Sequence, residues 1–413
     1  MSTISDKSSA HTREFATVAI LTLGFGLVGI DRFLISTLFP TIARDLHLGY
    51  GDIGTITGAL AIAWGIAALF MGNLSDHIGR RRVLVGALLA FSLMIGASGL
   101  ASGLLGLVLV RLIMGFADGA YTPASISATI EASPPERHGR NIGIQQMMLP
   151  LLGLGIAPLM VTALLRVIEW RWIFVLFALP GLLVTWLTWR IIAGGASVTA
   201  AAVRSPLRDW RTVLGYRNVR ILMICMLCWL SCIVVSSALL PSYLLDYLKL
   251  SGGQMGTVMS AIGFGCAVGT LVLPWLSDRI GRRPVMLFGT VGAGVSLAWL
   301  TTLGGESVGA LFWTLFAVHF FNNALITLTV GPLCTETVPP TLMATASGVI
   351  IAVGELLGGG LGPIAAGQVA ERFGIEHILW LPIGCLALGF VLCLMLRETN
   401  PMVRAAAALK SPG

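Results

Sequence analysis

Two apolar stretches of the sequence carry charged residues that could bind and move ions. Asp31 and Arg32 lie side by side within residues 15–39, and Arg111 and Asp118 lie within residues 105–128. A charge near the middle of a bilayer costs at least a few kcal/mol, so it persists only beside a partner, a cavity or a substrate. A carboxyl group there can carry a proton, and a guanidinium can hold an anion through its planar array of donors.

The composition places these charges in an integral membrane protein. The chain has 413 residues, 56% apolar and 11% charged, with a mean hydropathy of +0.89, whereas soluble domains carry about 25% charged residues. Apolar segments of about 20 residues recur throughout. The first is too long, and too charged at Asp31 and Arg32, for a cleavable signal peptide. We predict an all-α fold with twelve transmembrane helices, at 15–39, 53–72, 83–100, 105–128, 142–165, 172–192, 219–244, 255–276, 285–303, 308–330, 343–366 and 378–396.

The distribution of positive charge predicts the orientation. With a cytoplasmic amino terminus, 19 of the 26 Lys and Arg residues fall on the cytoplasmic side and five on the outer side, leaving Arg32 and Arg111 within the membrane. Cytoplasmic loops carry this excess, so we predict a multi-pass inner (plasma) membrane protein with both termini in the cytoplasm. The basic residues are scattered over loops, which argues against a nucleic-acid partner.

Two patterns occur twice at nearly the same offset. Residues 74–81 recur as 276–283, an offset of 202, and residues 131–135 recur as 336–340, an offset of 205. Each half holds six spans, so both halves have the same orientation in the membrane, as in parallel repeats. The predicted domains are an N-terminal six-helix bundle at 1–192, a cytoplasmic linker at 193–218 and a C-terminal six-helix bundle at 219–413.

Neither metal nor cofactor is predicted. The seven cysteines fall in or at the ends of apolar segments, and Cys225, Cys228 and Cys232 share a helical face with no His or carboxylate nearby in sequence. We interpret them as small apolar packing residues, without a disulfide framework. The sequence also lacks the Gly-x-x-x-x-Gly-Lys-Ser/Thr phosphate cradle.

Three motifs resemble signatures of the major facilitator superfamily. Residues 72–81 resemble its loop between the second and third helices, Arg-x-x-x-Gly-x-x-x-Gly at 111–119 resembles its fourth-helix signature, and residues 170–174 are similar to the start of its sixth helix. His77 replaces the usual base of the loop signature, whereas Arg279 fills that place in the second copy. The resemblance implies the twelve-helix fold of that superfamily and a monomer.

The loop signature implies a conformational role. In the superfamily such residues form charge contacts with neighbouring helix ends and hold one carrier state, while simple positive-inside topology is the alternative interpretation. The residues concerned are Gly72, Asp76, Gly79, Arg80, Arg81, Asp278, Gly281 and Arg282.

The intramembrane charges resemble the anion:cation symporter branch of the superfamily. The resemblance rests on Asp31-Arg32 and on the pattern at 111–123, although Asp118 stands where that branch often has Glu. The branch consists of proton-coupled carriers of organic anions, including sugar acids. The family's antiporter signature, a Gly-Pro pair in a glycine frame, is not matched at 153–158, which favours symport.

Helix geometry arranges the charges by depth. Asp31 lies roughly 24 Å along its helix at 1.5 Å per residue, and Arg111 lies at a similar depth, so the two can pair. Asp118 is almost two turns further, on the same face as Arg111 and about 10 Å deeper. We predict that Asp31, Asp118 and Arg111 couple protons. The alternative is a permanent Asp31–Arg111 pair that only fixes helix packing.

Arg32 points about 100° away from Asp31 and is the predicted anchor for a carboxylate or phosphate. Three interpretations stay open for its companions: Trp64 packs or stacks on substrate, His319 bonds between helices or binds substrate, and Glu355 serves the site or partners His319. The predicted substrate-binding residues are Arg32, Trp64, Gln145, Gln146, His319, Asn322, Asn323 and Glu355.

Together these features predict a secondary active transporter and not an enzyme. We expect proton-coupled uptake, by alternating access, of a small organic anion such as a sugar acid, an aromatic acid or another carboxylate. The predicted partners are that anion, protons and the lipid bilayer. One alternative is a proton-coupled exporter of drugs or metabolites, although paired arginines suit anions better. A membrane-embedded enzyme or sensor is disfavoured, because no nucleophile–base set or output domain is evident.

Overall fold

The computed structural model describes residues 2–192, 206–400 and 402–403, apart from the side chains of residues 2–13, 70–77, 206–209 and 344. Every regular element in these residues is a helix, and twelve helices are long and apolar enough to cross a membrane. The prediction of an all-α fold with twelve spans is confirmed. Most helices run several residues beyond the apolar segments, because polar residues continue them outside the bilayer.

The elements follow one another along the chain without long gaps. They are α1 (Ser2–Leu46), α2 (Tyr50–Ile78), α3 (Arg80–Ser98), α4 (Leu104–Ala132), α5 (His138–Pro150) with the π-helical η2 (Leu151–Ile156) and α6 (Ala157–Leu164), α7 (Trp170–Ile191), α8 (Pro206–Leu214), α9 (Arg217–Ser242) with η3 (Tyr243–Tyr247), α10 (Gly252–Ile280), α11 (Arg282–Leu300), α12 (Val308–Val330) with α13 (Pro332–Thr335), α14 (Met343–Val353) with the π-helical η5 (Gly354–Leu361) and α15 (Gly362–Phe373), and α16 (Trp380–Met395). Single 3-10 turns are η1 (Pro135–Arg137), η4 (Pro340–Leu342) and η6 (Ile375–His377).

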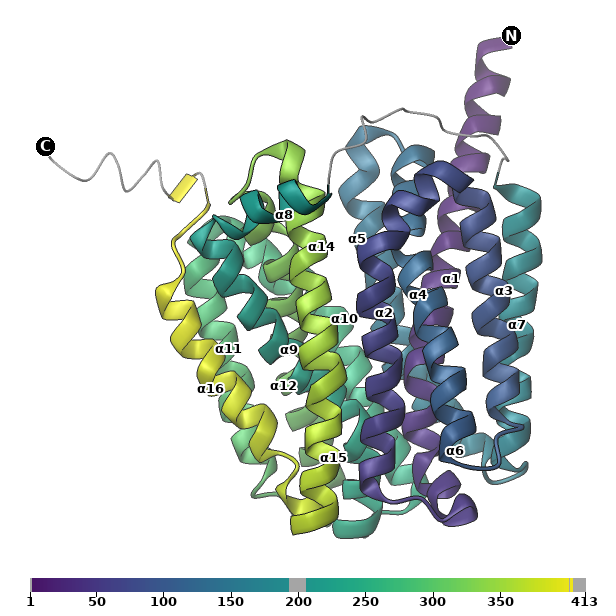
Figure 1. Ribbon diagram of the computed structural model, residues 1–413, viewed down its shortest axis with the longest axis vertical. Coiled ribbons are helices and arrows are strands. Elements are labelled where there is room, and N and C mark those ends of the chain that lie inside the picture. Colours follow the sequence, from purple (N-terminus) through teal and green to yellow (C-terminus); the bar gives the residue numbers. More distant parts are fainter. Residues whose placement is uncertain (1, 193–205, 401, 404–413) are drawn as a thin grey trace, which may run out of the picture.

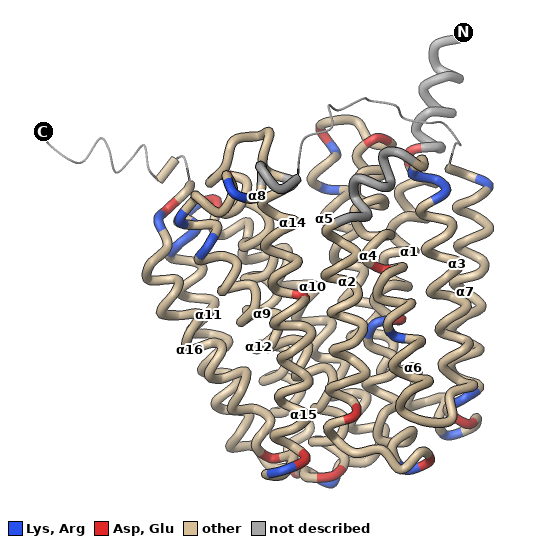
Figure 2. The backbone as a smooth tube through the Cα atoms, viewed as in Figure 1, with Lys and Arg blue, Asp and Glu red and all other residues tan. Residues whose placement is uncertain are grey.

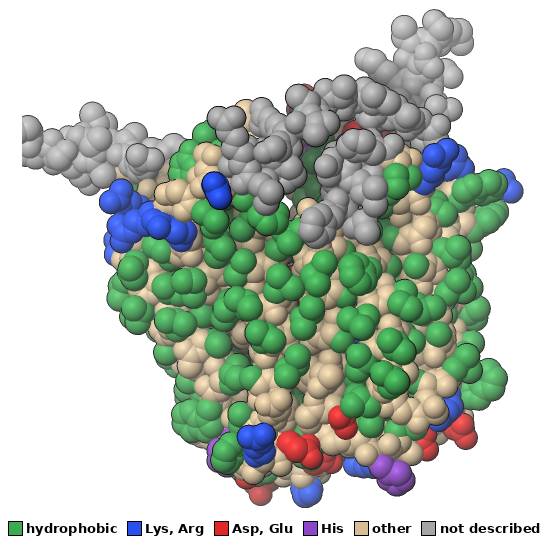
Figure 3. All heavy atoms as spheres, in the orientation of Figure 1, with side chains coloured by type: hydrophobic (Ala, Val, Ile, Leu, Met, Phe, Trp, Pro, Cys, Tyr) green, Lys and Arg blue, Asp and Glu red, His purple; other side chains and the backbone are tan. Residues whose placement is uncertain are grey.

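The surface is apolar around the middle and charged at the ends. Figure 3 shows hydrophobic side chains covering the middle of the visible face, and Leu93, Leu183, Val295 and Trp313 are among those exposed. An apolar surface this extensive is stable against lipid tails rather than against water. Figure 2 shows charged residues at both ends of the molecule and a small group about halfway between them.

The helices form two groups that lie side by side. Figure 1 shows α1–α7 on one side of the molecule and α9–α16 on the other, with both chain ends at the same end of the bundle. Within the groups, α2 packs against α4 and α10 packs against α12. Between them, α2 packs against η5 and α15, and α10 packs against η2 and α6. The short α8, which falls within the predicted linker, packs against α14.

The internal repeat of the sequence reappears as matched structure. Gly79 and Gly281 have φ angles of +97° and +105° and precede α3 and α11, a conformation that glycine adopts without the steric cost of a side chain. Arg80 forms an ion pair with Glu131, and Arg282 forms one with Glu336 at 2.8 Å. The π-helical η2 and η5 also begin at equivalent places, residues 151 and 354.

The remaining loop-signature residues differ in their contacts. Arg81 donates a hydrogen bond to the carbonyl of Trp189 and lies over its ring, 5.5 Å from the centroid, and Arg282 also pairs with Asp278. Gly72 and Asp76 fall within residues 70–77, whose side chains lie outside the described part of the structure. The conformational role of these residues stays a prediction.

The two groups are tightly joined by small residues on the half away from the chain ends and at mid-depth. A Cβ atom added to Gly58 would lie 2.6 Å from the carbonyl oxygen of Gly360, and one added to Gly263 would lie 1.9 Å from the backbone nitrogen of Gly155. Tyr50 donates a hydrogen bond of 3.0 Å to Asp246 across the same boundary. Side chains larger than hydrogen would therefore hold the groups apart.

Replacing Gly263 with alanine is expected to lower the melting temperature by several degrees. The new methyl group meets the backbone of η2 rather than a movable side chain, and overpacking of this kind costs roughly 1–3 kcal/mol. Thermal unfolding of purified protein checks this. Gly294→Ala is the matched control, because nothing lies within 4 Å of the Cβ position at Gly294. Equal melting temperatures for the two variants would contradict the tight contact.

Candidate functional site

Two aspartates and an arginine meet between α1 and α4. The side chain of Arg111 donates a hydrogen bond of 2.6 Å to the backbone carbonyl of Asp31 and lies 3.8 Å from its carboxylate. The carboxyl groups of Asp31 and Asp118 lie within hydrogen-bonding reach of one another. Arg111 is 1% exposed and both aspartates are 0% exposed. The predicted Asp31–Arg111 pairing is present.

The position of Asp118 differs from the predicted one. Depth counting separated it from Asp31 by almost two turns, whereas the structure places the two carboxyl groups together. The long side chain of Arg111 reaches along the helix to the backbone of Asp31, so the two residues need not lie at the same level. The four carboxylate oxygens accept no hydrogen bond from the described residues, which leaves them open to a shared proton.

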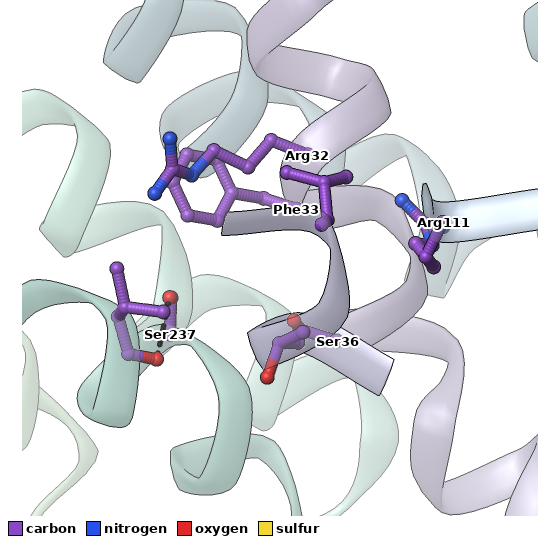
Figure 4. A pocket seen from close by; sticks show the side chains of 8 residues that line it. Arg32, Phe33, Ser36, Arg111 and Ser237 are labelled. Atoms are coloured by element: carbon purple, nitrogen blue, oxygen red, sulfur yellow. Dashed lines mark hydrogen bonds between the residues drawn. The ribbon is translucent and has the colours of Figure 1, made fainter. Parts of the chain in front are cut away.

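Arg32 faces the other group of helices. Its guanidinium donates two hydrogen bonds to Glu355 of η5, at 3.0 and 2.7 Å, and lies 4.7 Å from the ring centroid of Trp64. Figure 4 shows the side chains of Arg32 and Arg111 directed to different sides of α1. The prediction that Arg32 points away from Asp31 fits this arrangement. Trp64 packs on Arg32, and the anchor already holds a carboxylate of the chain itself.

A small pocket lies beside Arg32 and Arg111, at the boundary between the two groups (Figure 4). Its empty space is about 260 Å³, slightly below the roughly 300–1,000 Å³ of small-molecule sites. It combines two guanidinium groups with hydroxyl and apolar side chains, a composition suited to a small anion with an apolar or hydroxylated body. The lining residues are Arg32, Phe33, Ser36, Thr57, Leu60, Arg111, Val234 and Ser237.

Sequence reasoning missed the hydroxyl groups of this lining. Ser36 follows Arg32 by four residues and Thr57 precedes Trp64 by seven, so helical periodicity places each on the face of a predicted site residue. That signal was available. Ser237 belongs to the other half of the chain, and no spacing relates it to Arg32.

The other predicted substrate residues do not line this pocket. His319 donates from Nδ1 to the carbonyl of Leu315 at 3.0 Å, so the proposed His319–Glu355 pair is not formed. Asn322 donates to the carbonyl of Trp229, also at 3.0 Å. These polar groups hold helices of the second half together. Each nevertheless keeps one buried atom, His319 Nε2 and Asn322 Oδ1, without a partner in the described residues.

The remaining three residues also lie outside the lining. Asn323 donates to Thr270 Oγ1 at 2.6 Å. Gln145 is fully buried and accepts a hydrogen bond of 3.1 Å from Thr129, while its Nε2 lacks a partner in the described residues. Gln146 is half-buried. The seven cysteines are free, and the described part holds no group of three or more His, Cys, Asp or Glu placed to bind a metal.

A twelve-helix bundle with buried charges at mid-depth and a pocket between two helix groups defines a polytopic membrane protein of the secondary-transporter class. The family model described as Major Facilitator Superfamily matches residues 21–354 and 234–411. The chain belongs to this superfamily.

Similar proteins agree with this assignment. The chain is 27% identical to "Sialic acid transporter NanX" of Escherichia coli (strain K12), over 87% of this chain and 88% of that protein. It is also 27% identical to the "3-(3-hydroxy-phenyl)propionate transporter" of the same organism, over 88% of each chain. Its fold resembles the crystal structure of a bacterial homologue of the human lysosomal transporter Spinster, with a TM-score of 0.76 and 17% identity, over 93% of this chain and 96% of that one. The prediction of a transporter rather than an enzyme is confirmed.

Proposed function

We propose that the protein takes up a small organic anion together with protons, by alternating access. The observation that carries this proposal is the buried Asp31–Arg111–Asp118 cluster beside a pocket that contains Arg32. The two relatives described above are named for sialic acid and for 3-(3-hydroxy-phenyl)propionate, both of which are carboxylic acids. Sugar acids and aromatic acids are therefore the favoured substrate classes.

The two aspartates are suited to carry the proton. Facing carboxylates repel one another, and burial disfavours a charge on either. One proton held between them removes the repulsion and supplies the hydrogen bond that their oxygens lack, leaving one negative charge beside Arg111. Asp118 also lies in the field of Arg32. Protonation of Asp118 therefore makes Arg32 more attractive to an anion, which links proton uptake to substrate binding.

Alternating access requires the two helix groups to move as bodies. We assign the moving bodies to residues 1–192 and 219–413, joined by the linker 193–218, and the substrate to the boundary between them. The positive-inside rule then places the chain ends in the cytoplasm and the protein in the inner (plasma) membrane, as a monomer. The unpaired atoms of Gln145, His319 and Asn322 become available to a larger substrate when the bodies separate.

A panel of organic acids tests the substrate class. Sialic acid or 3-(3-hydroxyphenyl)propionate is expected to raise the melting temperature of the purified protein, more at low than at neutral pH, because proton and anion bind together. A ligand at 100 times its Kd stabilises by about 2.7 kcal/mol. The neutral amide of the same acid is the control and should have no effect. Stabilisation by lipophilic cations and by no acid would instead indicate an exporter.

A further inference from the structure

The Arg32–Glu355 pair joins the two helix groups inside the membrane. Arg32 belongs to α1 and Glu355 to η5, and the two residues are 323 positions apart in sequence. Both are largely buried, at 8% and 5% exposure. The two parallel hydrogen bonds occupy the fork of the guanidinium in the geometry that arginine uses for any carboxylate. A second carboxylate cannot take the same edge of Arg32 while Glu355 holds it.

The chain makes room for this pair with a glycine. A Cβ atom added to Gly359 would lie 2.8 Å from Glu355 Oε2 and 3.5 Å from the Arg32 nitrogen that it contacts. The added atom would also lie 3.2 Å from the Cβ of Ala61 on α2. The easiest relief for such a clash is displacement of the flexible Glu355 carboxylate. Glu355 lies within the π-helical η5, and π-helical turns recur at functional sites.

The surroundings of Glu355 offer Arg32 as its basic partner among the described residues. From α2, Gly65 and Ala61 face the segment, and from α9 the neighbouring glycines contact Met226, Leu230 and the backbone of Leu227. Glu355 is therefore bound to Arg32 or left as a buried charge, which is costly. Removal of the carboxylate from Arg32 requires a competing anion.

We propose that Glu355 is a tethered competitor of the substrate, which occupies the anion-binding fork of Arg32 in the empty carrier. The inference rests on the proposed function, because it takes Arg32 as the anchor for a carboxylate. When a substrate carboxylate binds Arg32, it displaces Glu355 and breaks the link between α1 and η5. Substrate binding thereby frees the two helix groups to move. Glu355 returns to Arg32 when the substrate leaves, which keeps the empty pocket from retaining a buried, unpaired guanidinium.

Glu355→Gln tests the competition directly. The acid that most stabilises the wild-type protein, sialic acid or 3-(3-hydroxyphenyl)propionate, is titrated against both proteins. Affinity falls in proportion to the fraction of binding-competent molecules. If Arg32 is free in about a tenth of the wild-type molecules, E355Q is expected to bind about tenfold more tightly. Uptake by E355Q in proteoliposomes should be slower, because nothing displaces the acid at release.

Gly359→Ala provides a second variant that keeps the carboxylate. Its methyl group pushes Glu355 away from Arg32, so G359A should also bind the acid more tightly than the wild type. Gly348→Ala is the matched control on α14 of the same span, because nothing lies within 4 Å of the Cβ position at Gly348. G348A should bind with wild-type affinity. G359A thus tests the inference even if E355Q is poorly folded.

The outcomes separate the inference from the proposed function. If no organic acid stabilises the wild-type protein, the proposed function fails and takes the inference with it. If the wild type binds an acid but E355Q and G359A bind it equally or more weakly, Glu355 is a fixed structural partner and only the inference is overturned. Tighter binding by both variants, with G348A unchanged, supports the tethered competitor.

Discussion

Replacing Asp118 with asparagine is expected to abolish proton-driven accumulation of the substrate while exchange of substrate across the membrane continues. Asn keeps the size of the side chain but cannot carry a proton. A pH difference of two units stores about 2.7 kcal/mol per proton, enough for an accumulation of about a hundredfold. The D118N variant should bring the substrate only to equal concentrations on both sides. Counterflow needs binding and movement but no proton, so it should persist.

Proteoliposomes that contain the purified protein and an imposed pH gradient provide the measurement, with labelled substrate followed over time. Asp31→Asn is expected to behave like D118N, because the two carboxyl groups face one another. Asp52→Asn is the control: Asp52 accepts a hydrogen bond from the backbone of Gly49 in the loop before α2, away from the buried cluster. Uphill uptake at wild-type levels in both D31N and D118N would refute the proton role and leave the cluster as a packing device.

Much of the fold was predictable because the bilayer imposes strong constraints on sequence. A helix that crosses lipid must satisfy its own backbone and bury about 20 apolar residues, so the spans could be counted directly. The repeat was predictable for a similar reason. Gly79 and Gly281 need the same positive φ angle, and Arg80 and Arg282 pair with equivalent glutamates.

The candidate site was predictable only in part, because residue spacing describes one helix at a time. It identified Asp31, Arg111 and Asp118 as buried charges, and it predicted the pairing of Asp31 with Arg111. It could not identify Glu355 as the partner of Arg32, because that contact depends on how η5 of one group packs against α1 of the other. Local reasoning offered His319 to Glu355, whereas His319 bonds within its own helix.

The π-helical segments were a further limit. The glycine-rich run at 358–363 indicated a bend or tight packing, but not the π geometry of η5, which includes Glu355. Replacing one hydrogen-bond register with another costs little locally, so tertiary contacts decide it. Close approaches such as Gly358 to the backbone of Leu227 on α9 supply those contacts.

Replacing Arg32 with glutamine is expected to weaken binding of the organic acid by about 100-fold or more. Removing one partner of a buried, hydrogen-bonded charge pair costs roughly 2–5 kcal/mol, and Arg32 supplies both donors of the anion-binding fork. The same change should lower the melting temperature, since it leaves the carboxylate of Glu355 buried without its partner, a loss of roughly 3–5 kcal/mol. Titration and thermal unfolding measure the two effects on the same sample.

The double variant Arg32→Gln with Glu355→Gln separates binding from folding. Two neutral amides can hydrogen-bond to each other in place of the ion pair, and neither leaves a charge behind, so most of the lost stability should return. Binding should not return, because the pocket still lacks the guanidinium that receives the carboxylate. Recovery of acid binding in the double variant would show that Arg32 serves only to neutralise Glu355. In that case Arg111, the other basic residue of the lining, would have to hold the anion.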